Sequence, residues 1–307
     1  MSILSQILDS SIIFSFDRSG FLRHSKDFKD ENWCGKGKVA LITGANSGIG
    51  YVTAEILLKY NVNVHIFCRS EASGKEAVEK LKSSNSDGTI TLHTLDISDK
   101  KAIDRWLKSE APPHVDILVN NAGGMSSSLN FNTENIEITW ATHLLGHYFL
   151  TSGLIEQRSL SKGSRVITVS SGGMYLQKLD LSDLLWKKQK YDKYRAYANA
   201  KRAQVILTQL WDEQLGPSIR FSTMHPGWVD TKGVKEAMPT FHRLLGPRLR
   251  SPKQGADTII WLALTQEKYP GGKLWFDRKI VAEHKFNFTK ESVTGRNKLW
   301  NLLKSFA

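Results

Sequence analysis

Residues 38–50 read KVALITGANSGIG, and this stretch decides the fold. An apolar run leads into a turn with three glycines, and an amphipathic stretch follows and continues to Tyr60. A second apolar run then covers residues 62–68. This order of strand, glycine turn, helix and strand is typical of the βαβ unit of a parallel sheet. Glycines at such a turn let the backbone approach a pyrophosphate at the N-terminus of the helix, so the stretch predicts a dinucleotide site rather than a helix-capping turn.

The same alternation continues along the chain. Further apolar runs predict strands at residues 90–95, 115–119, 165–169 and 219–224. Helical patterns begin near Lys75, Lys101, Thr133, Lys193 and Gly255. Strands this apolar are buried on both faces. We therefore expect one α/β domain with a Rossmann-type, doubly wound parallel sheet and helices on both faces. Its expected bounds are 38–276, after an N-terminal extension (1–37) and before a C-terminal tail (277–307).

Composition excludes several protein classes. The chain has 307 residues, of which 40% are hydrophobic and 23% charged, so it is neither a fibre nor a disordered tail. Its net charge of +12 is spread along the chain without a nucleic-acid-binding signature, and we expect no nucleic-acid partner. Two cysteines, Cys34 and Cys68, are too few for a disulfide framework, which favours a reducing, cytoplasmic setting and no metal site.

The N-terminal extension contains an apolar stretch from Ile3 to Phe16 that is interrupted by polar residues. This stretch is too short and too polar to span a bilayer. We interpret it as a docking arm in preference to a membrane-surface helix, because a basic face is missing before Arg18. The oligomeric state stays open, a homo-oligomer included.

Four further motifs follow the glycine turn in a fixed order. They are Asn120-Asn121-Ala122-Gly123, Ser170-Ser171, Tyr197-Ala-Asn-Ala-Lys201 and Pro226-Gly227, and each follows a predicted strand or opens a predicted helix. In this arrangement the sequence resembles the short-chain dehydrogenase/reductase family over residues 38 to about 265. The resemblance implies a nicotinamide cofactor and a reaction between a carbonyl and an alcohol.

The end of the second strand bears on the choice of cofactor. An acidic residue there binds the 2′-hydroxyl of NAD, whereas an arginine accommodates the 2′-phosphate of NADP. This strand ends in Cys68-Arg69, which favours NADP(H), although Arg69 could instead pair with Glu71 on the surface. The resemblance assigns the other cofactor contacts to Gly44, Asn46, Ser47, Gly48, Ile49, Gly50, Asp96, Asn121, Ala122, Gly123, Tyr197, Lys201, Pro226, Gly227, Val229 and Thr231.

Tyr197 and Lys201 are four residues apart, so on a helix they share one face. Moving a hydride to or from carbon requires a proton at the neighbouring oxygen, and a free tyrosine has a pKa near 10. Bringing that pKa near 7 takes roughly 4 kcal/mol of support for the phenolate, which we expect from the charge of Lys201 and of the oxidised nicotinamide. The resemblance makes Tyr197 the acid or base and Ser171 the group that orients the substrate. A scaffold without turnover, or a membrane-surface binder, are the alternatives.

His143 departs from the family pattern, because many members have an Asn three residues before a Gly at this point, where it holds a water linked to the lysine. We expect a buried, neutral His143 to replace that Asn and activity to fall below about pH 6, where the imidazole would become charged. Alternatively, the helix register differs by one residue and His143 is only a packed or solvent-facing histidine. The loop after Pro226 mixes apolar with basic side chains. It forms either a packed lid or an apolar substrate wall, and it could also contact an anionic membrane surface. These residues are Trp228, Met238, Phe241, Arg243, Leu244, Leu245, Arg248, Leu249 and Arg250.

Overall fold

The computed structural model describes residues 12–29, 31–82, 87–216 and 218–306. These residues form a sheet with the strand order β3-β2-β1-β4-β5-β6-β7-β8. The first seven strands are parallel, and β8 pairs antiparallel with β7. The strands are β1 (Val39–Thr43), β2 (Asn63–Cys68), β3 (Ile90–Thr94), β4 (Ile117–Asn120), β5 (Arg165–Val169), β6 (Arg220–Met224), β7 (Lys273–Phe276) and β8 (Lys279–Ile280). The order reverses between β1 and β4, and ligands of doubly wound sheets bind at this switch point.

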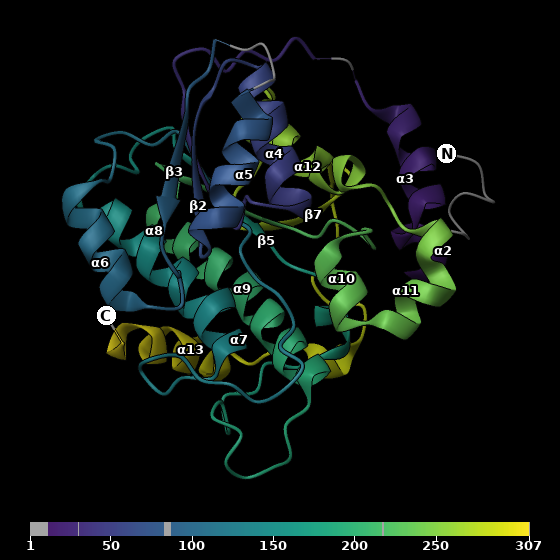
Figure 1. The fold of residues 1–307 in the computed structure, drawn as a ribbon. Coiled ribbons are helices and arrows are strands. Elements are labelled where there is room, and N and C mark those ends of the chain that lie inside the picture. Colours follow the sequence, from purple (N-terminus) through teal and green to yellow (C-terminus); the bar gives the residue numbers. More distant parts are fainter. Residues whose placement is uncertain (1–11, 30, 83–86, 217, 307) are drawn as a thin grey trace.

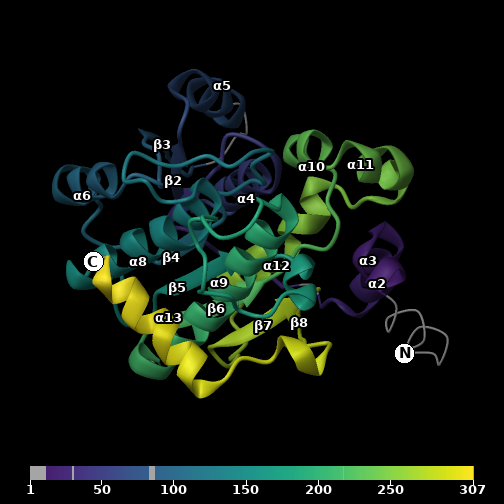
Figure 2. The same ribbon diagram turned by 90° about the horizontal axis from the view of Figure 1, so that it is seen from below.

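Helices cover both faces of the sheet (Figures 1 and 2). One layer contains α4 (Gly48–Lys59), α5 (Glu71–Lys82) and α12 (Pro252–Leu264). The other contains α6 (Lys100–Ser109), α7 (Ile138–Trp140), α8 (His147–Glu156), α9 (Lys193–Leu215) and α13 (Val293–Ser305). Along β1, Leu41 packs into the second layer, and its neighbours Ala40 and Ile42 pack into the first. The predicted Rossmann-type, doubly wound fold is confirmed.

The elements differ from the prediction mainly at their ends and near the C-terminus. A capping box between Ser251 and Gln254 starts α12 before Gly255. Glu137 caps α7, so the helix expected near Thr133 begins later. The sequence did not predict β7, a strand of only four residues. The segment expected as a C-terminal tail contains β8 and α13.

Two short N-terminal helices, α2 (Ile12–Phe16) and α3 (Arg18–His24), lie at the edge of the molecule beside α11 (Pro239–Leu245). α10 (Lys232–Ala237) precedes α11. An ion pair of 2.5 Å between Asp17 and Arg248 joins the two parts. Most of the apolar stretch from Ile3 to Phe16 lies outside the described residues. None of the described helices is both long and apolar enough to cross a bilayer.

Candidate active site

The glycine turn between β1 and α4 brings the backbone unusually close to its neighbours. Gly44 and Gly48 have φ values of +67° and +58°, which L-residues rarely adopt. A Cβ on Gly44 would lie 2.8 Å from the Cα of Ala122, and one on Gly50 would overlap the carbonyl oxygen of Gly44. Glycine is therefore required at these positions, and the resulting bare backbone can approach a ligand closely.

The N-terminus of α4 has free hydrogen-bonding capacity. Ser47 is its N-cap residue but its side chain makes no capping hydrogen bond. The side chains of Asp99, Asp192 and Ser251, in contrast, cap α6, α9 and α12. The first N–H groups of α4 therefore remain available to an anion, and the helix dipole favours one there.

Thr43 joins this turn to the loop after β4. Its hydroxyl accepts hydrogen bonds from the backbone N–H groups of Asn121 and Ala122, both at 2.9 Å. The Asn121 amide donates to the carbonyl oxygen of Thr43 at 2.8 Å. Asn120 is buried and donates to Thr151, so it acts as a structural amide. Residues 121–123 thus lie beside the glycine turn, as the motif order predicts.

The end of β2 carries an exposed cation beside a neutral thiol. Burial raises the pKa of Cys68 to about 11, so it has no negative charge at neutral pH. Arg69 is exposed, and no carboxylate of the described residues lies within ion-pair distance of it. Glu71, the alternative partner, pairs instead with Lys75 at 2.6 Å.

Other residues predicted to contact the cofactor lie around the crevice that is expected at the switch point between β1 and β4. Oδ1 of Asp96, after β3, accepts hydrogen bonds from the backbone and hydroxyl of Ser98. Asn46 donates to the hydroxyl of Ser73 at 3.1 Å. A Cβ on Gly48 would lie 3.3 Å from Thr231 Cγ2, so the loop after β6 contacts the glycine turn. The crevice is therefore bounded on both sides by predicted residues.

Ser171, Tyr197 and Lys201 meet at the ends of β5 and α9. Lys201 is buried, and its ammonium group donates to the carbonyl oxygen of Val169 at 2.7 Å. Its Nζ lies 5.5 Å from the centre of the Tyr197 ring. Ser171 lies close enough to Tyr197 to lower the pKa of that phenol. The neighbouring Ser170 points elsewhere, because its hydroxyl donates to the carbonyl oxygen of Lys201.

Burial shifts both titratable groups toward their neutral forms. It raises the pKa of Tyr197, although the hydrogen bond with Ser171 opposes the shift. It lowers the pKa of Lys201 to about 7. Neither shift favours the phenolate in the protein without a cofactor, and the support expected from Lys201 and the oxidised nicotinamide stays a prediction. Additional charge is required, and an anionic cofactor near Lys201 would favour its charged form.

The comparisons with known proteins agree with this geometry. The family model described as short chain dehydrogenase matches residues 38–240. The chain is 42% identical to human Dehydrogenase/reductase SDR family member 12 over 274 residues, which cover 88% of this chain and 86% of that protein. The chain belongs to the short-chain dehydrogenase/reductase family. It is thus an NAD(P)-dependent oxidoreductase by family.

More distant members of the short-chain dehydrogenase/reductase family share the fold. Human Retinol dehydrogenase 12 is 31% identical over 277 residues, covering 87% of this chain and 85% of its own. A Burkholderia cenocepacia short chain dehydrogenase, solved in complex with NADP, superposes with a TM-score of 0.62. It is 22% identical and covers 78% of this chain and 96% of its own.

His143 is where the chain departs from the family pattern, and it lies beside the reaction centre. It belongs to a π-helical turn, Ala141–Gly146, and π-helices often occur at functional sites. Its buried ring lies 5.3 Å from the Tyr197 ring. Nε2 contacts the backbone N–H and C=O of Gly124 at 3.0 and 2.8 Å. Gln204 donates to the His143 carbonyl oxygen at 2.6 Å, which holds the turn against α9.

The expected acid limb near pH 6 does not fit this environment. Burial, followed by the charge of Lys201, lowers the pKa of His143 well below its usual value of 6.5. His143 is therefore neutral at pH 7. It is also neutral near pH 6, where the sequence analysis expected it to become charged.

We expect His143→Asn to retain turnover, with no change in the shape of the pH–rate profile between pH 6 and pH 8. An amide replaces a neutral imidazole, so no charge is gained or lost in this range. Initial rates of carbonyl reduction measure the profile. A fall of activity below about pH 6 in the unaltered protein that is absent in His143→Asn would instead show that charging of His143 limits the rate there.

The loop after β6 divides into packed and exposed parts. Trp228 and Phe241 are half-buried and their ring centres lie 5.2 Å apart, edge to face. Met238 and Leu245 are also half-buried. Leu244 is 70% exposed, so it is part of neither a packed lid nor a pocket wall.

Some residues that shape the site carry no sequence signal that we recognised. Thr43 joins two motifs through its hydroxyl, and a Thr directly before the first glycine of the turn was the available clue. The link from Gln204 to His143 depends on a π-turn, which no pattern predicted. The sequence analysis also missed the contact between Phe16 and Arg250, which lie 234 residues apart in the chain.

Proposed function

We propose that this chain is an NADP(H)-dependent oxidoreductase that interconverts a carbonyl with a secondary or primary alcohol on an apolar small molecule. The observation that supports NADP(H) most directly is the end of β2. There Arg69, which pairs with no carboxylate of the described residues, follows the neutral Cys68, and the strand has no acidic residue at its end to bind the 2′-hydroxyl of NAD. A guanidinium also matches the geometry of a phosphate.

The residues around the reaction centre suit a proton transfer coupled to hydride transfer. A bound nicotinamide cofactor would supply or accept the hydride. In reduction, Tyr197 would donate its phenolic proton to the carbonyl oxygen, and Ser171 would hold that oxygen through a hydrogen bond. In oxidation Tyr197 would take the proton back. The charged form of Lys201 would stabilise the phenolate, and His143 would fix the backbone of Gly124 beside it.

Two features support an apolar substrate. The segment after the Pro226–Gly227 turn contains a packed aromatic pair, Trp228 and Phe241. Two relatives of the chain are named retinol dehydrogenases, and retinol is an apolar alcohol. A panel of steroid ketones, retinal, quinones and short aldehydes, assayed by loss of NADPH absorbance, tests this proposal. Preference for a short, polar aldehyde would contradict it.

We expect Arg69→Ala to raise the Kd for NADPH by about ten- to a hundredfold and to leave the Kd for NADH within about twofold. The reason is that only NADPH carries the 2′-phosphate. Quenching of tryptophan fluorescence measures both constants. Lys101→Ala is the control, because it removes another exposed cation at the start of α6. Equal losses for the two cofactors would overturn the assignment to NADP(H).

The structure weakens the alternative of a membrane-surface protein. Arg248 pairs with Asp17, Arg250 pairs with Asp277, and Leu249 is buried. Two of the three arginines expected at a lipid surface are therefore engaged in ion pairs within the protein.

We expect Arg243→Gln to leave co-sedimentation with vesicles of phosphatidylserine and phosphatidylcholine unchanged. Arg243 is the exposed arginine of this loop, and a single basic contact contributes about 1 kcal/mol at such a surface. Lys101→Gln is again the control. Strong binding of the unaltered chain that is lost in Arg243→Gln alone would instead support a membrane contact.

A further inference from the structure

Arg250 is a fully buried cation at the centre of a junction between distant segments. Its guanidinium forms a two-point ion pair with Asp277, at 2.6 and 2.9 Å. Its remaining N–H groups donate to backbone carbonyl oxygens of the N-terminal helices and of the loop after β6. These oxygens belong to Ser15, Phe16, Asp17 and Pro226. Arg250 thus satisfies its donors by tying three segments together.

The junction fixes the loop after Pro226 at close range. Gly227 has a φ of +75°, and a Cβ there would lie 2.5 Å from Arg250 Nε and 2.6 Å from the Phe16 carbonyl oxygen. Trp228 donates its N–H to the same Phe16 oxygen at 2.8 Å and accepts from the Arg250 N–H at 2.7 Å. The backbone of this loop therefore rests directly on the N-terminal segment.

The Phe16 side chain also contacts the turn that follows Ser171. A Cβ on Gly172, the residue after Ser171, would overlap the Phe16 ring. The ring also packs edge to face on Trp228, with centres 6.1 Å apart, and lies 6.3 Å from the centre of the Tyr175 ring. Phe16 is 2% exposed. One aromatic ring from the N-terminal segment thus separates the turn after Ser171 from the turn after Pro226.

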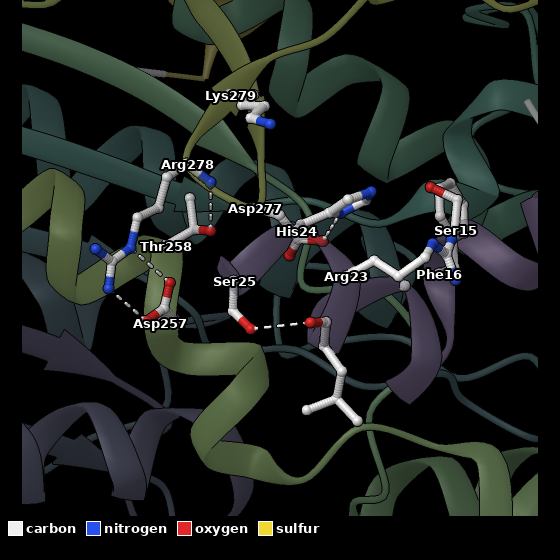
Figure 3. Close-up of polar contacts among 12 residues, drawn as sticks. Ser15, Phe16, Arg23, His24, Ser25, Asp257, Thr258, Asp277, Arg278 and Lys279 are labelled. Carbon is white, nitrogen blue, oxygen red and sulfur yellow. Dashed lines mark hydrogen bonds and ion pairs between the residues drawn. The ribbon is translucent and has the colours of Figure 1, made fainter. Parts of the chain in front are cut away.

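Further contacts hold the segment in place. His24, at the end of α3, hydrogen-bonds through Nδ1 to Asp277 at 2.6 Å (Figure 3). Burial alone would raise the pKa of Asp277, but the hydrogen bond from His24 and the charge of Arg250 lower it, so the carboxylate is ionised. Asp277 and Arg278 have positive φ values of 48° and 59°, a costly backbone for residues with side chains. The surrounding contacts maintain that conformation.

We propose that residues 12–29 form a wall of the substrate site, in which Phe16 positions the Ser171–Gly172 turn against the Gly227–Trp228 turn and Arg250 holds Phe16 in place. This inference rests on the proposed function, because it names the elements that shape the site for the carbonyl substrate. Phe16 and Arg250 are positioning residues. The contacts of Phe16 and Arg250 described above are with the turns after Ser171 and Pro226 and with Asp277, and not with the glycine turn or Arg69.

Gly20 offers a way to displace the segment without altering the site itself. It is buried in α3, where a Cβ would overlap the carbonyl oxygen of Ser15. Gly295 in α13 is the matched control, because a Cβ there meets ordinary contacts at 3.5 Å or more. In Gly20→Ala we expect backbone amides of residues 227–231 and 171–177 to exchange hydrogen for deuterium at least tenfold faster than in Gly295→Ala. Amides of β1 and β4 should exchange equally in both variants. Unchanged exchange at 227–231 and 171–177 would overturn the proposal.

Kinetics on the best carbonyl of the panel separate positioning from general loss of structure. Phe16→Leu keeps the carbonyl oxygen that Arg250 and Trp228 bind, and it removes only the ring. We expect its KM for the carbonyl to rise about tenfold, with kcat and the Kd for NADPH changing less than threefold. Equal KM values in Phe16→Leu and the unaltered chain would contradict a role of the ring. If no carbonyl is turned over, the proposed function fails, and the exchange experiment still decides this inference.

Discussion

Replacing Tyr197 by phenylalanine is expected to lower kcat for carbonyl reduction by about a thousandfold while the Kd for NADPH stays within about threefold. Only the phenolic hydroxyl is removed, and a positioned acid contributes about 10²- to 10⁴-fold to such a step. Among the described residues, Tyr197 is the phenol whose pKa Ser171 lowers, and its ring centre lies 5.5 Å from the buried Lys201 Nζ. Loss of NADPH absorbance measures turnover, and fluorescence titration measures binding.

Tyr194→Phe is the matched control for this experiment. Tyr194 lies three residues earlier in α9 and is 53% exposed, so the same hydroxyl is removed outside the site. We expect it to retain full turnover. Residual activity above about a tenth in Tyr197→Phe would assign the acid to another group. An unaltered chain that binds NADPH but reduces nothing in the panel would favour a scaffold.

Replacing Lys201 by methionine is expected to abolish most turnover and to stabilise the cofactor-free protein most strongly at low pH. In the folded protein burial lowers the pKa of Lys201 to about 7 from 10.5. Between these values the unfolded chain binds more protons than the folded one, so the contribution of Lys201 to the free energy of unfolding rises with pH. Below pH 7 the folded protein holds a buried ammonium group, at a cost of roughly 5 kcal/mol relative to high pH. Methionine carries no such charge.

The gain in unfolding free energy from Lys201→Met should therefore be roughly 3 kcal/mol larger at pH 6 than at pH 9. Urea unfolding at the two pH values measures it. Lys193→Met is the control, because Lys193 is in the same helix and also donates to a backbone carbonyl oxygen, that of Ala237, at 2.7 Å. Loss of the lysine hydrogen bond is expected to change the free energy of unfolding equally at the two pH values. A difference between the two lysine variants that does not change with pH would show that Lys201 is not destabilised by its charge.

The cofactor half of the site could be predicted from sequence because its residues lie in short motifs at the ends of consecutive strands. Gly44 and Asn121 meet because β1 and β4 are neighbours in a doubly wound sheet, and that order follows from the fold class. The side chains of Tyr197 and Lys201 share a face because α9 is a helix. The pKa of Lys201 could not be predicted, since it depends on burial, which the spacing of residues does not describe.

The substrate half was harder to predict, because its contacts join residues far apart in the sequence. Arg250 was grouped with surface arginines on account of its basic, apolar neighbourhood, yet it is fully buried. Its partner Phe16 precedes the first strand, and no periodic pattern relates the two. Leu249 was likewise expected at a surface and is 5% exposed. A pattern of alternating strands and helices does not specify how segments outside it dock.

The junction at Arg250 also affects the order in which the protein can fold during its synthesis. The carbonyl oxygens of Ser15 and Phe16 leave the ribosome 235 and 234 residues before the arginine that binds them. At about 5–20 residues per second, this interval lasts on the order of ten to fifty seconds. During that time β1 to β6 can pair in sequence while Phe16 still lacks its partner. The junction at Phe16 therefore cannot be completed until Arg250 and Asp277 have been synthesised.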